Sequence, residues 1–353
     1  MTVLALDIGG TKFAAAHVTA GGTLVRREER PIGPVPATTL SDLVADFRAP
    51  GLRAVGIGSA GPLDVRAGTV SPINIPAWRG FPLADTVRRL VPGADVALAG
   101  DGQCMALGEW WRGGHGADSL LGIVVSTGVG GGLILDGRPV LGGTGNAGHV
   151  GHVIVDRDGE PCSCGTNGCL ETIASGPSMV RWALSNGWTP TAPTDSGTPP
   201  GPALGVGVGV GVGVDSRAGA RTDIAGGART DVGGGRPDGV TARELADDAR
   251  RGARVPLAAF ERAADALATV VLNTAAVADL HHVVIGGGVA AAGPLLIGPL
   301  RERLAKRAGM DFIRHVQVAL TSLERDAGLY GAAALALLTT GTALRPSMPG
   351  GAG

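Results

Sequence analysis

The sequence predicts an α/β protein, because short apolar runs of strand length alternate with longer segments of helical periodicity. Three of the predicted strands pass directly into glycine-rich segments, as expected where a strand enters a tight turn. Of the 353 residues, 44% are hydrophobic and 17% are charged, which is a globular composition. A chain of this length can form two domains with substantial cores.

The predicted elements begin with a β-hairpin whose strands, residues 3–8 and 13–18, are joined by a Gly-Gly-Thr turn. Further strands are predicted at 54–58, 96–99, 120–125 and 283–285. Helices are predicted from Asp101 to Trp111, from Pro256 to about residue 278, and over 327–339 with Asp326 as N-cap.

The composition of the chain also argues against nucleic acid and membranes as binding partners. The formal net charge of −1 gives no general attraction to nucleic acid or to an anionic membrane. The N-terminal residues lack the basic and apolar regions of a secretory signal, and no uncharged apolar run reaches the roughly 18 to 20 residues that span a bilayer. We therefore expect a cytoplasmic protein that acts on small molecules.

Residues 189–239 break the α/β pattern. They combine a Pro/Thr/Gly-rich start, five Gly-Val pairs over 205–214 and the sequence Gly-Ala-Arg-Thr-Asp twice. Such alternation has high backbone entropy and few side chains to pack. We predict a flexible surface insertion without a catalytic role, a buried Gly-Val strand being the alternative, and a disordered tail at 341–353.

Three of the four cysteines lie within eight residues of each other, and a histidine precedes them by ten. Three thiolates and one imidazole form the soft tetrahedral ligand set that zinc prefers. Ordinary buried cysteines or a loop disulfide are the alternatives, and a disulfide is disfavoured in the cytoplasm. With four protein ligands the predicted Zn²⁺ is structural; the ligands are His152, Cys162, Cys164 and Cys169.

Glycine-rich segments with the chemistry to hold phosphates follow three predicted strands. In the first, residues 7–12 (Asp-Ile-Gly-Gly-Thr-Lys), Asp7 can position a hydrated Mg²⁺ while backbone N–H groups face phosphate. None of the three has the spacing of a P-loop or a dinucleotide fold, and one glycine turn alone is weakly specific. The second and third segments are 126–132 and 286–288. The predicted contacts to cofactor are Asp7, Gly9, Gly10, Thr11, Lys12, Thr127, Gly128, Gly130, Gly286, Gly287 and Gly288.

Asp101 directly follows a predicted strand and opens a helix. An aspartate in that position is commonly a simple N-cap. It can also be a general base within reach of a substrate hydroxyl. The residues alone leave both interpretations open.

Taken together, these motifs resemble the ROK family of sugar kinases and related repressors. The resemblance also includes residues 147–152, 162–171 and 326–333, and it covers nearly the whole chain outside 189–239 and the tail. It implies two ribonuclease-H-like domains of the actin–hexokinase–Hsp70 class around a cleft. The small domain would comprise 1–116 and the helix at about 327–340, and the large domain 117–326 with a zinc loop at 152–169. Relatives are commonly dimers or tetramers.

The resemblance also implies ATP and Mg²⁺ at the glycine segments and a sugar at the hinge. Asp101 would accept the proton of the sugar 6-hydroxyl, and His152 would both bind zinc and hold a sugar hydroxyl. The implied substrate contacts are Gly61, Asn74, Asp101, Gly128, His149, His152 and Glu171.

Three positions depart from the pattern of glucose-phosphorylating members. His149 stands where those members generally have glutamate, and His149-Val150-Gly151-His152 resembles the bacterial N-acetylmannosamine kinases of the family. Gln103 shares that resemblance, because hexose-specific members commonly have asparagine there. Gly100 replaces the asparagine that normally precedes the catalytic aspartate, and Asn74 or Asn146 are candidates to compensate.

The predicted activity is therefore ATP-dependent phosphorylation of the 6-hydroxyl of N-acetylmannosamine. A glucokinase in which His149 reflects drift is one alternative. A non-catalytic sugar-binding regulator is another. Family repressors carry a helix-turn-helix ahead of the core, and the phosphate hairpin begins here at residue 3, so no nucleic-acid partner is expected.

Overall fold

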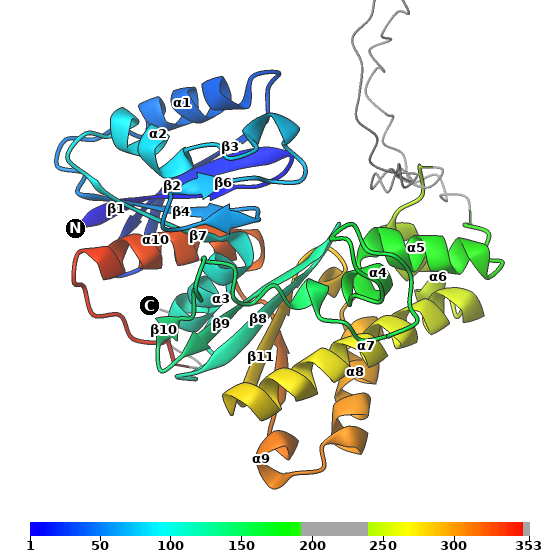
Figure 1. Cartoon of the computed structure of the whole chain (residues 1–353). Coiled ribbons are helices and arrows are strands. Elements are labelled where there is room, and N and C mark those ends of the chain that lie inside the picture. The colour runs from blue at the N-terminus through cyan, green and yellow to red at the C-terminus, as the bar shows by residue number, and fades with distance from the viewer. Residues whose placement is uncertain (192–238, 349–353) are drawn as a thin grey trace, which may run out of the picture.

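The computed structural model describes residues 1–191 and 239–348 and contains two five-stranded sheets, with a helical layer between them (Figure 1). The predicted insertion at 189–239 falls outside the described residues except at its two ends. Of the predicted tail at 341–353, residues 341–348 are described, and the N–H of Ser347 there donates to the carbonyl of Trp111 at 3.1 Å. In the described part of the chain, no helix has both the length and the apolar character required to cross a membrane.

The first sheet has the strand order β3-β2-β1-β4-β7. Its first three strands are antiparallel, whereas β4 and β7 run parallel to β1. Both faces of β1 are buried: Val3 and Ala5 face one core, and Leu4 and Leu6 face another, as the two-residue period of a strand requires. The bounds are β1 (Thr2–Ile8), β2 (Lys12–Thr19), β3 (Leu24–Pro31), β4 (Ala54–Ser59), β7 (Asp95–Gly100), α1 (Pro36–Asp46) and α2 (Leu83–Leu90).

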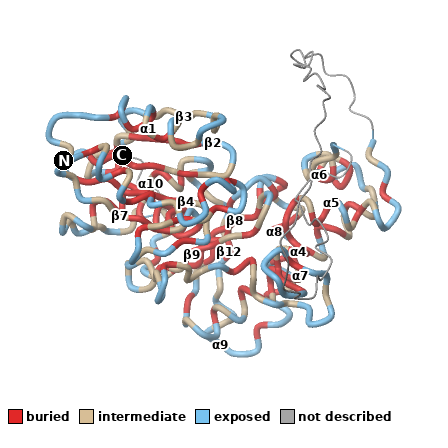
Figure 2. Tube along the Cα trace, turned by 45° about the horizontal axis from the view of Figure 1, so that its top comes forward, coloured by how far each residue is buried: buried red, intermediate tan, exposed pale blue. Residues whose placement is uncertain are grey.

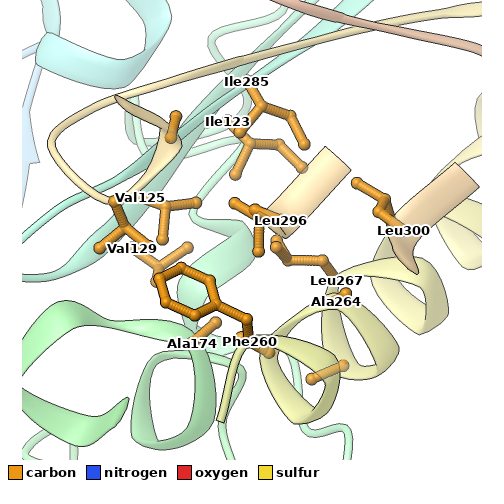
Figure 3. Close-up of a cluster of buried hydrophobic side chains, with 14 of the residues drawn as sticks. Ile123, Val125, Val129, Ala174, Phe260, Ala264, Leu267, Ile285, Leu296 and Leu300 are labelled. Atoms are coloured by element: carbon orange, nitrogen blue, oxygen red, sulfur yellow. The ribbon is translucent and has the colours of Figure 1, made fainter. Parts of the chain in front are cut away.

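The second sheet repeats this arrangement in the order β10-β9-β8-β11-β12, again with three antiparallel strands followed by two parallel ones. Phe260 and Leu267 of the long helix α7 pack with Ile123 and Ile285 of the strands (Figure 3). The bounds are β8 (Leu120–Val125), β9 (Val129–Leu135), β10 (Arg138–Pro139), β11 (His282–Gly286), β12 (Gln317–Leu320), α7 (Arg254–Ala278) and α8 (Pro294–Arg307).

Helices α3 (Asp101–Arg112) and α10 (Ala327–Thr339) form the layer between the sheets, and most residues of both helices are buried (α10 is labelled in Figure 2). Their core includes Val3 of the first sheet and Leu120 of the second. The helices touch closely, since a Cβ on Gly108 would lie 2.1 Å from the carbonyl oxygen of Ala327. The start of α3 is therefore held against both halves of the molecule.

The remaining elements are short. They are β5 (Leu63–Asp64), β6 (Thr69–Val70), α4 (Glu171–Ala174), α5 (Gly176–Ser185), α6 (Ala242–Arg250), α9 (Asp311–Arg314) and the 3₁₀ turns η1 (Pro76–Trp78), η2 (Val150–His152), η4 (Ala290–Ala292) and η5 (Glu324–Asp326). Of these, α4, α5 and α6 lie together on the right of Figure 1, and α9 lies at the bottom.

A buried carboxylate joins the two segments by which the chain crosses between the halves. Glu109 of α3 is fully buried. Its carboxylate lies 2.7 Å from Nε2 of His115, in the crossing segment 113–119. It also accepts hydrogen bonds from the backbone N–H groups of Ser322 (3.3 Å) and Leu323 (3.1 Å) and from the hydroxyl of Thr321, in the segment before α10. One side chain therefore fixes both connections.

The structure confirms the predicted α/β class and the predicted strands and helices, with two corrections. The segment 126–132 is not a continuous loop, because β9 begins at Val129 and leaves only 126–128 as the turn. Among the described residues, Asp326 stands at the N-cap position of α10 without accepting a capping bond, because its carboxylate accepts from Nε of Arg27 at 2.7 Å instead.

Candidate active site

A cavity of about 840 Å³ opens between the segment after β4 and the segment before α4. The segments that follow β4 contribute Gly61 and Arg79, and the segment between β10 and α4 contributes Asn146, His149 and His152. The predicted sugar-contacting histidines therefore line one cavity together with the predicted Gly61, although they are about 90 residues apart in sequence.

Asp101 is the first residue of α3, directly at the end of β7. Its carboxylate accepts a hydrogen bond from the N–H of Gly102 at 2.7 Å, and Gly100 occupies the N-cap position. The residue reaches solvent, yet burial by the surrounding protein raises its pKa, with the Gly102 N–H and His149 opposing. An exposed, partly desolvated carboxylate suits a group that accepts a proton from substrate.

His149 stands over the Gly61 segment, with Nε2 3.2 Å from the position that a Cβ on Gly61 would take. The rings of His149 and His152 are nearly parallel, with centroids 6.1 Å apart. Burial and the neighbouring His152 lower the pKa of His149, against the charges of Asp101 and Glu171. A lowered pKa favours the neutral form of His149 at neutral pH, and a neutral imidazole has one donor and one acceptor nitrogen.

Glu171 begins α4 and reaches the turn between β8 and β9. Its Oε2 accepts a hydrogen bond from the N–H of Val129 at 2.8 Å. A Cβ on Gly128 would lie 2.6 Å from the same oxygen, so a side chain at this position would displace the carboxylate. The predicted residues Gly128 and Glu171 are thereby in direct contact.

The four predicted zinc ligands come together. Their ligand atoms all lie within 4.8 Å of one another, with 3.6 Å between Nδ1 of His152 and Sγ of Cys162 and 3.6 Å between Sγ of Cys164 and Sγ of Cys169. Ligands of a tetrahedral zinc with bonds of about 2.3 Å are about 3.8 Å apart. The donor set and its spacing fit Zn²⁺, with Nδ1 of His152 next to the cysteines, and His152 also lines the cavity.

A second cavity, of about 500 Å³, joins the three glycine segments. Thr11 comes from the β1–β2 hairpin, Thr127 from the β8–β9 turn and Gly288 from the end of β11. The N-terminus of α5 also lines this cavity through Gly176. Helix N-termini and converging backbone turns favour bound phosphate.

Asp7 lies at the end of β1, beneath the start of α10, where a Cβ on Gly328 would be 3.0 Å from Oδ2. Burial and, secondarily, the carboxylate of Asp101 raise the pKa of Asp7 to about 7, against the charge of Lys12. Two carboxylates close enough for one to raise the pKa of the other favour a bound divalent cation.

Several predicted contacts have other partners. The N–H of Gly9 closes the hairpin by bonding to the carbonyl of Lys12 at 3.1 Å, and the ammonium of Lys12 pairs with Glu29 at 2.9 Å. Asn74 packs on Gly10, where a Cβ would lie 2.8 Å from its amide nitrogen. In β9, Gly130 has open space beside it, whereas Gly286 and Gly287 stand where β11 ends and the chain turns.

Asn146, a candidate to replace the missing asparagine, is already engaged. Its amide oxygen accepts from the N–H of Leu63 at 3.2 Å, and its amide nitrogen donates to the carbonyl of Leu63 at 2.7 Å. The sequence singled out Gln103 only for its resemblance to one subgroup of the family. The one sequence feature that points to its buried hydrogen bonds is its place three residues after Gly100, the N-cap residue of α3.

Two sheets of equivalent strand order, with glycine turns between them, form an actin/hexokinase-like ATPase fold, the fold of the ROK sugar kinases. The sequence matches the ROK family over residues 3–338, and the chain belongs to that family.

Among relatives, it is 31% identical to the glucokinase of Thermotoga maritima over 347 residues, 95% of this chain and 97% of the other. It is also 31% identical to the N-acetylmannosamine kinase of Yersinia pseudotuberculosis over 338 residues, 94% and 96% of the two chains. The solved ROK glucokinase of Streptomyces griseus, in complex with glucose and AMPPNP, has a TM-score of 0.70 at 28% identity, covering 96% and 100%.

Proposed function

We propose that this protein transfers the terminal phosphoryl group of ATP to the 6-hydroxyl of N-acetylmannosamine. The observation that supports this proposal most directly is that His149 lines a cavity of about 840 Å³ and is close enough to Asp101 for their charges to interact, while the glycine turns converge on a second cavity. Sugar-kinase activity of the ROK type is what the family provides. The choice of sugar is the step that rests on His149.

Each residue of the site has a role in this reaction. Asp101 accepts the proton of the 6-hydroxyl as the oxygen attacks phosphorus. Glu171 and Nε2 of His152 hold neighbouring sugar hydroxyls, and the zinc loop fixes both. The three turns hold the phosphates, and Asp7 positions the hydrated Mg²⁺, which neutralises phosphate charge. Transfer of this kind depends mainly on alignment and electrostatics.

The choice of N-acetylmannosamine follows from the neutral imidazole. An axial N-acetyl group at C2 presents an amide N–H and a carbonyl, and neutral His149 offers one acceptor and one donor. A glutamate in its place would only accept. Sites built around one hydrogen-bonding pattern discriminate strongly against another. The 31% identity to a glucokinase keeps glucose as the second candidate. The cytoplasmic location and the oligomeric assembly stay predictions from the sequence.

A coupled ADP-release assay tests the proposal. N-acetylmannosamine, glucose and N-acetylglucosamine are compared by kcat/KM with purified protein and with Asp101→Asn. We expect preference for N-acetylmannosamine, and a loss of about 10²–10⁴-fold in kcat for the variant while calorimetry still detects sugar binding. Preference for glucose would replace the proposed substrate. Absence of turnover on all three would overturn the proposal.

A further inference from the structure

A buried glutamine ties the proposed base to the sugar-binding loop. Gln103 lies in the first turn of α3, two residues after Asp101, and is 3% exposed. Its Oε1 accepts a hydrogen bond from the N–H of Gly100 at 3.1 Å. Its Nε2 donates to the carbonyl of Ala147 at 2.7 Å and to that of Val140 at 3.3 Å. One amide therefore meets three backbone groups of two separate segments.

The two ends of this amide serve different parts of the site. The Gly100 N–H belongs to the residue directly before Asp101, so the bond at Oε1 fixes where α3 begins. Ala147 lies two residues before His149, so the bonds at Nε2 fix the loop that carries the histidine. Glutamine is required for this combination, because glutamate would place an acceptor against two carbonyls and leucine would satisfy none of the three groups.

The backbone around Gln103 packs closely against β9. A Cβ on Gly132 would lie 2.4 Å from Cα of Gln103, and a Cβ on Gly102 would lie 2.6 Å from the carbonyl oxygen of Gly131. The start of α3 is therefore in direct backbone contact with β9. Asparagine would withdraw the amide by about 1.5 Å, the length of one carbon–carbon bond, and could not span both segments.

We propose that Gln103 is a positioning residue that sets Asp101 and His149 relative to each other. This inference rests on the proposed function, and it assigns to the site a determinant that never touches the sugar. Misplacing a catalytic group by about 1 Å costs up to about a hundredfold in rate. The donor end governs sugar affinity, and the acceptor end governs the alignment of the base.

Three variants separate the two ends. Gln103→Leu removes all three bonds, and we expect about a tenfold rise in sugar KM with about a tenfold fall in kcat. Gln103→Asn should resemble it. Gln103→Glu keeps the acceptor for Gly100, so we expect sugar KM to rise while kcat changes by less than about threefold. The KM for ATP should stay unchanged in all three.

Asp248→Asn is the matched control for lost stability. Asp248 is also a buried polar side chain on a helix, and it accepts hydrogen bonds from Nε1 of Trp188 at 2.7 Å and from the N–H of Thr191 at 3.1 Å. It lines neither of the two site cavities. We expect its thermal unfolding temperature to fall while kcat and both KM values remain those of the wild type.

Hydrogen exchange gives a readout that does not depend on turnover. Faster exchange over residues 140–149 in Gln103→Glu and Gln103→Leu, with α5 unchanged, supports the inference even if the wild type phosphorylates none of the three sugars. Unaltered exchange there overturns it. With an active wild type, the inference also fails if Gln103→Leu keeps kcat and sugar KM while only its unfolding temperature falls, or if the KM for ATP rises equally.

Discussion

Glu171 and Gly128 are in contact across the cleft floor, because a Cβ on Gly128 would lie 2.6 Å from Oε2 of Glu171. That oxygen also accepts the N–H of Val129 at 2.8 Å. The turn that ends β8, whose Thr127 lines the second cavity, therefore holds the carboxylate of Glu171 in place.

Gly128→Ala should displace Glu171 without affecting the fold. We expect the KM for sugar to rise about tenfold or more, since one hydrogen bond to a charged group contributes about 1.5–3 kcal/mol. Steady-state kinetics with the sugar varied measures this. Gly298→Ala is the control, because its Cβ would meet no atom of the described residues within 4 Å. A Gly128→Ala enzyme with unchanged sugar KM would show that Glu171 does not hold the sugar.

The zinc cluster predicts one metal ion per chain. Cys164→Ser should lose this zinc, lower the unfolding temperature and raise the sugar KM, because His152 and the loop to Glu171 lose their anchor. Elemental analysis of purified protein measures the metal. Ser163→Ala, at the adjacent position, should retain it. Wild-type protein purified without chelators and found free of zinc would contradict the structural-zinc proposal.

The raised pKa of Asp7 predicts that the free energy of unfolding depends on pH. Its pKa is about 7 in the folded chain against 3.8 ordinarily, so between about pH 4 and 7 the folded state binds a proton that the unfolded state lacks. Stability from this group is present below about pH 4 and is lost as the pH rises through 7.

In urea titrations without Mg²⁺ or nucleotide, the free energy of unfolding of the wild type should fall more between pH 5 and 8 than that of Asp7→Asn. The variant should also lose turnover. Parallel pH dependences of the two proteins would be evidence against a raised pKa at Asp7.

The hydrogen bonds of Glu109 predict that its carboxylate holds together the two segments by which the chain crosses between the sheets. In Glu109→Gln an amide NH₂ replaces an oxygen that faces only donors, and we expect a loss of about 1–3 kcal/mol in the free energy of unfolding. Glu261→Gln is the control, because Glu261 is 60% exposed and its nearest cation, Arg303, is 3.8 Å away. Its effect should stay within about 0.5 kcal/mol. If Glu109→Gln and Glu261→Gln had the same free energy of unfolding, Glu109 would not hold the two crossing segments together.

Features that depend only on a short stretch of residues could be predicted from the sequence. The hairpin around Gly10, the Asp101 helix start and the Cys162–Cys169 loop are local patterns, and the structure contains each of them. The bonds of Gln103 and Glu109 join residues up to 44 and 214 positions apart. No local pattern reports such contacts, because they arise only when the sheets and the layer of α3 and α10 have packed.

The second glycine segment shows how composition can mislead. Gly131 and Gly132 follow Gly130 in sequence and look like a loop, but they belong to β9. Their missing side chains are needed because α3 packs on that strand, where a Cβ on Gly132 would lie 2.4 Å from Gln103. Glycine here serves close packing, whereas at Gly128 it serves the approach of a carboxylate.

The most direct test of the account is the ratio of kcat/KM for N-acetylmannosamine to that for glucose, measured in the wild type and in His149→Glu. A neutral imidazole that reads the C2 substituent predicts a ratio well above one in the wild type and a fall of about tenfold or more in the variant. A wild-type ratio below one, or a ratio that the substitution leaves unchanged, would contradict the assignment of His149 as the residue that selects the sugar.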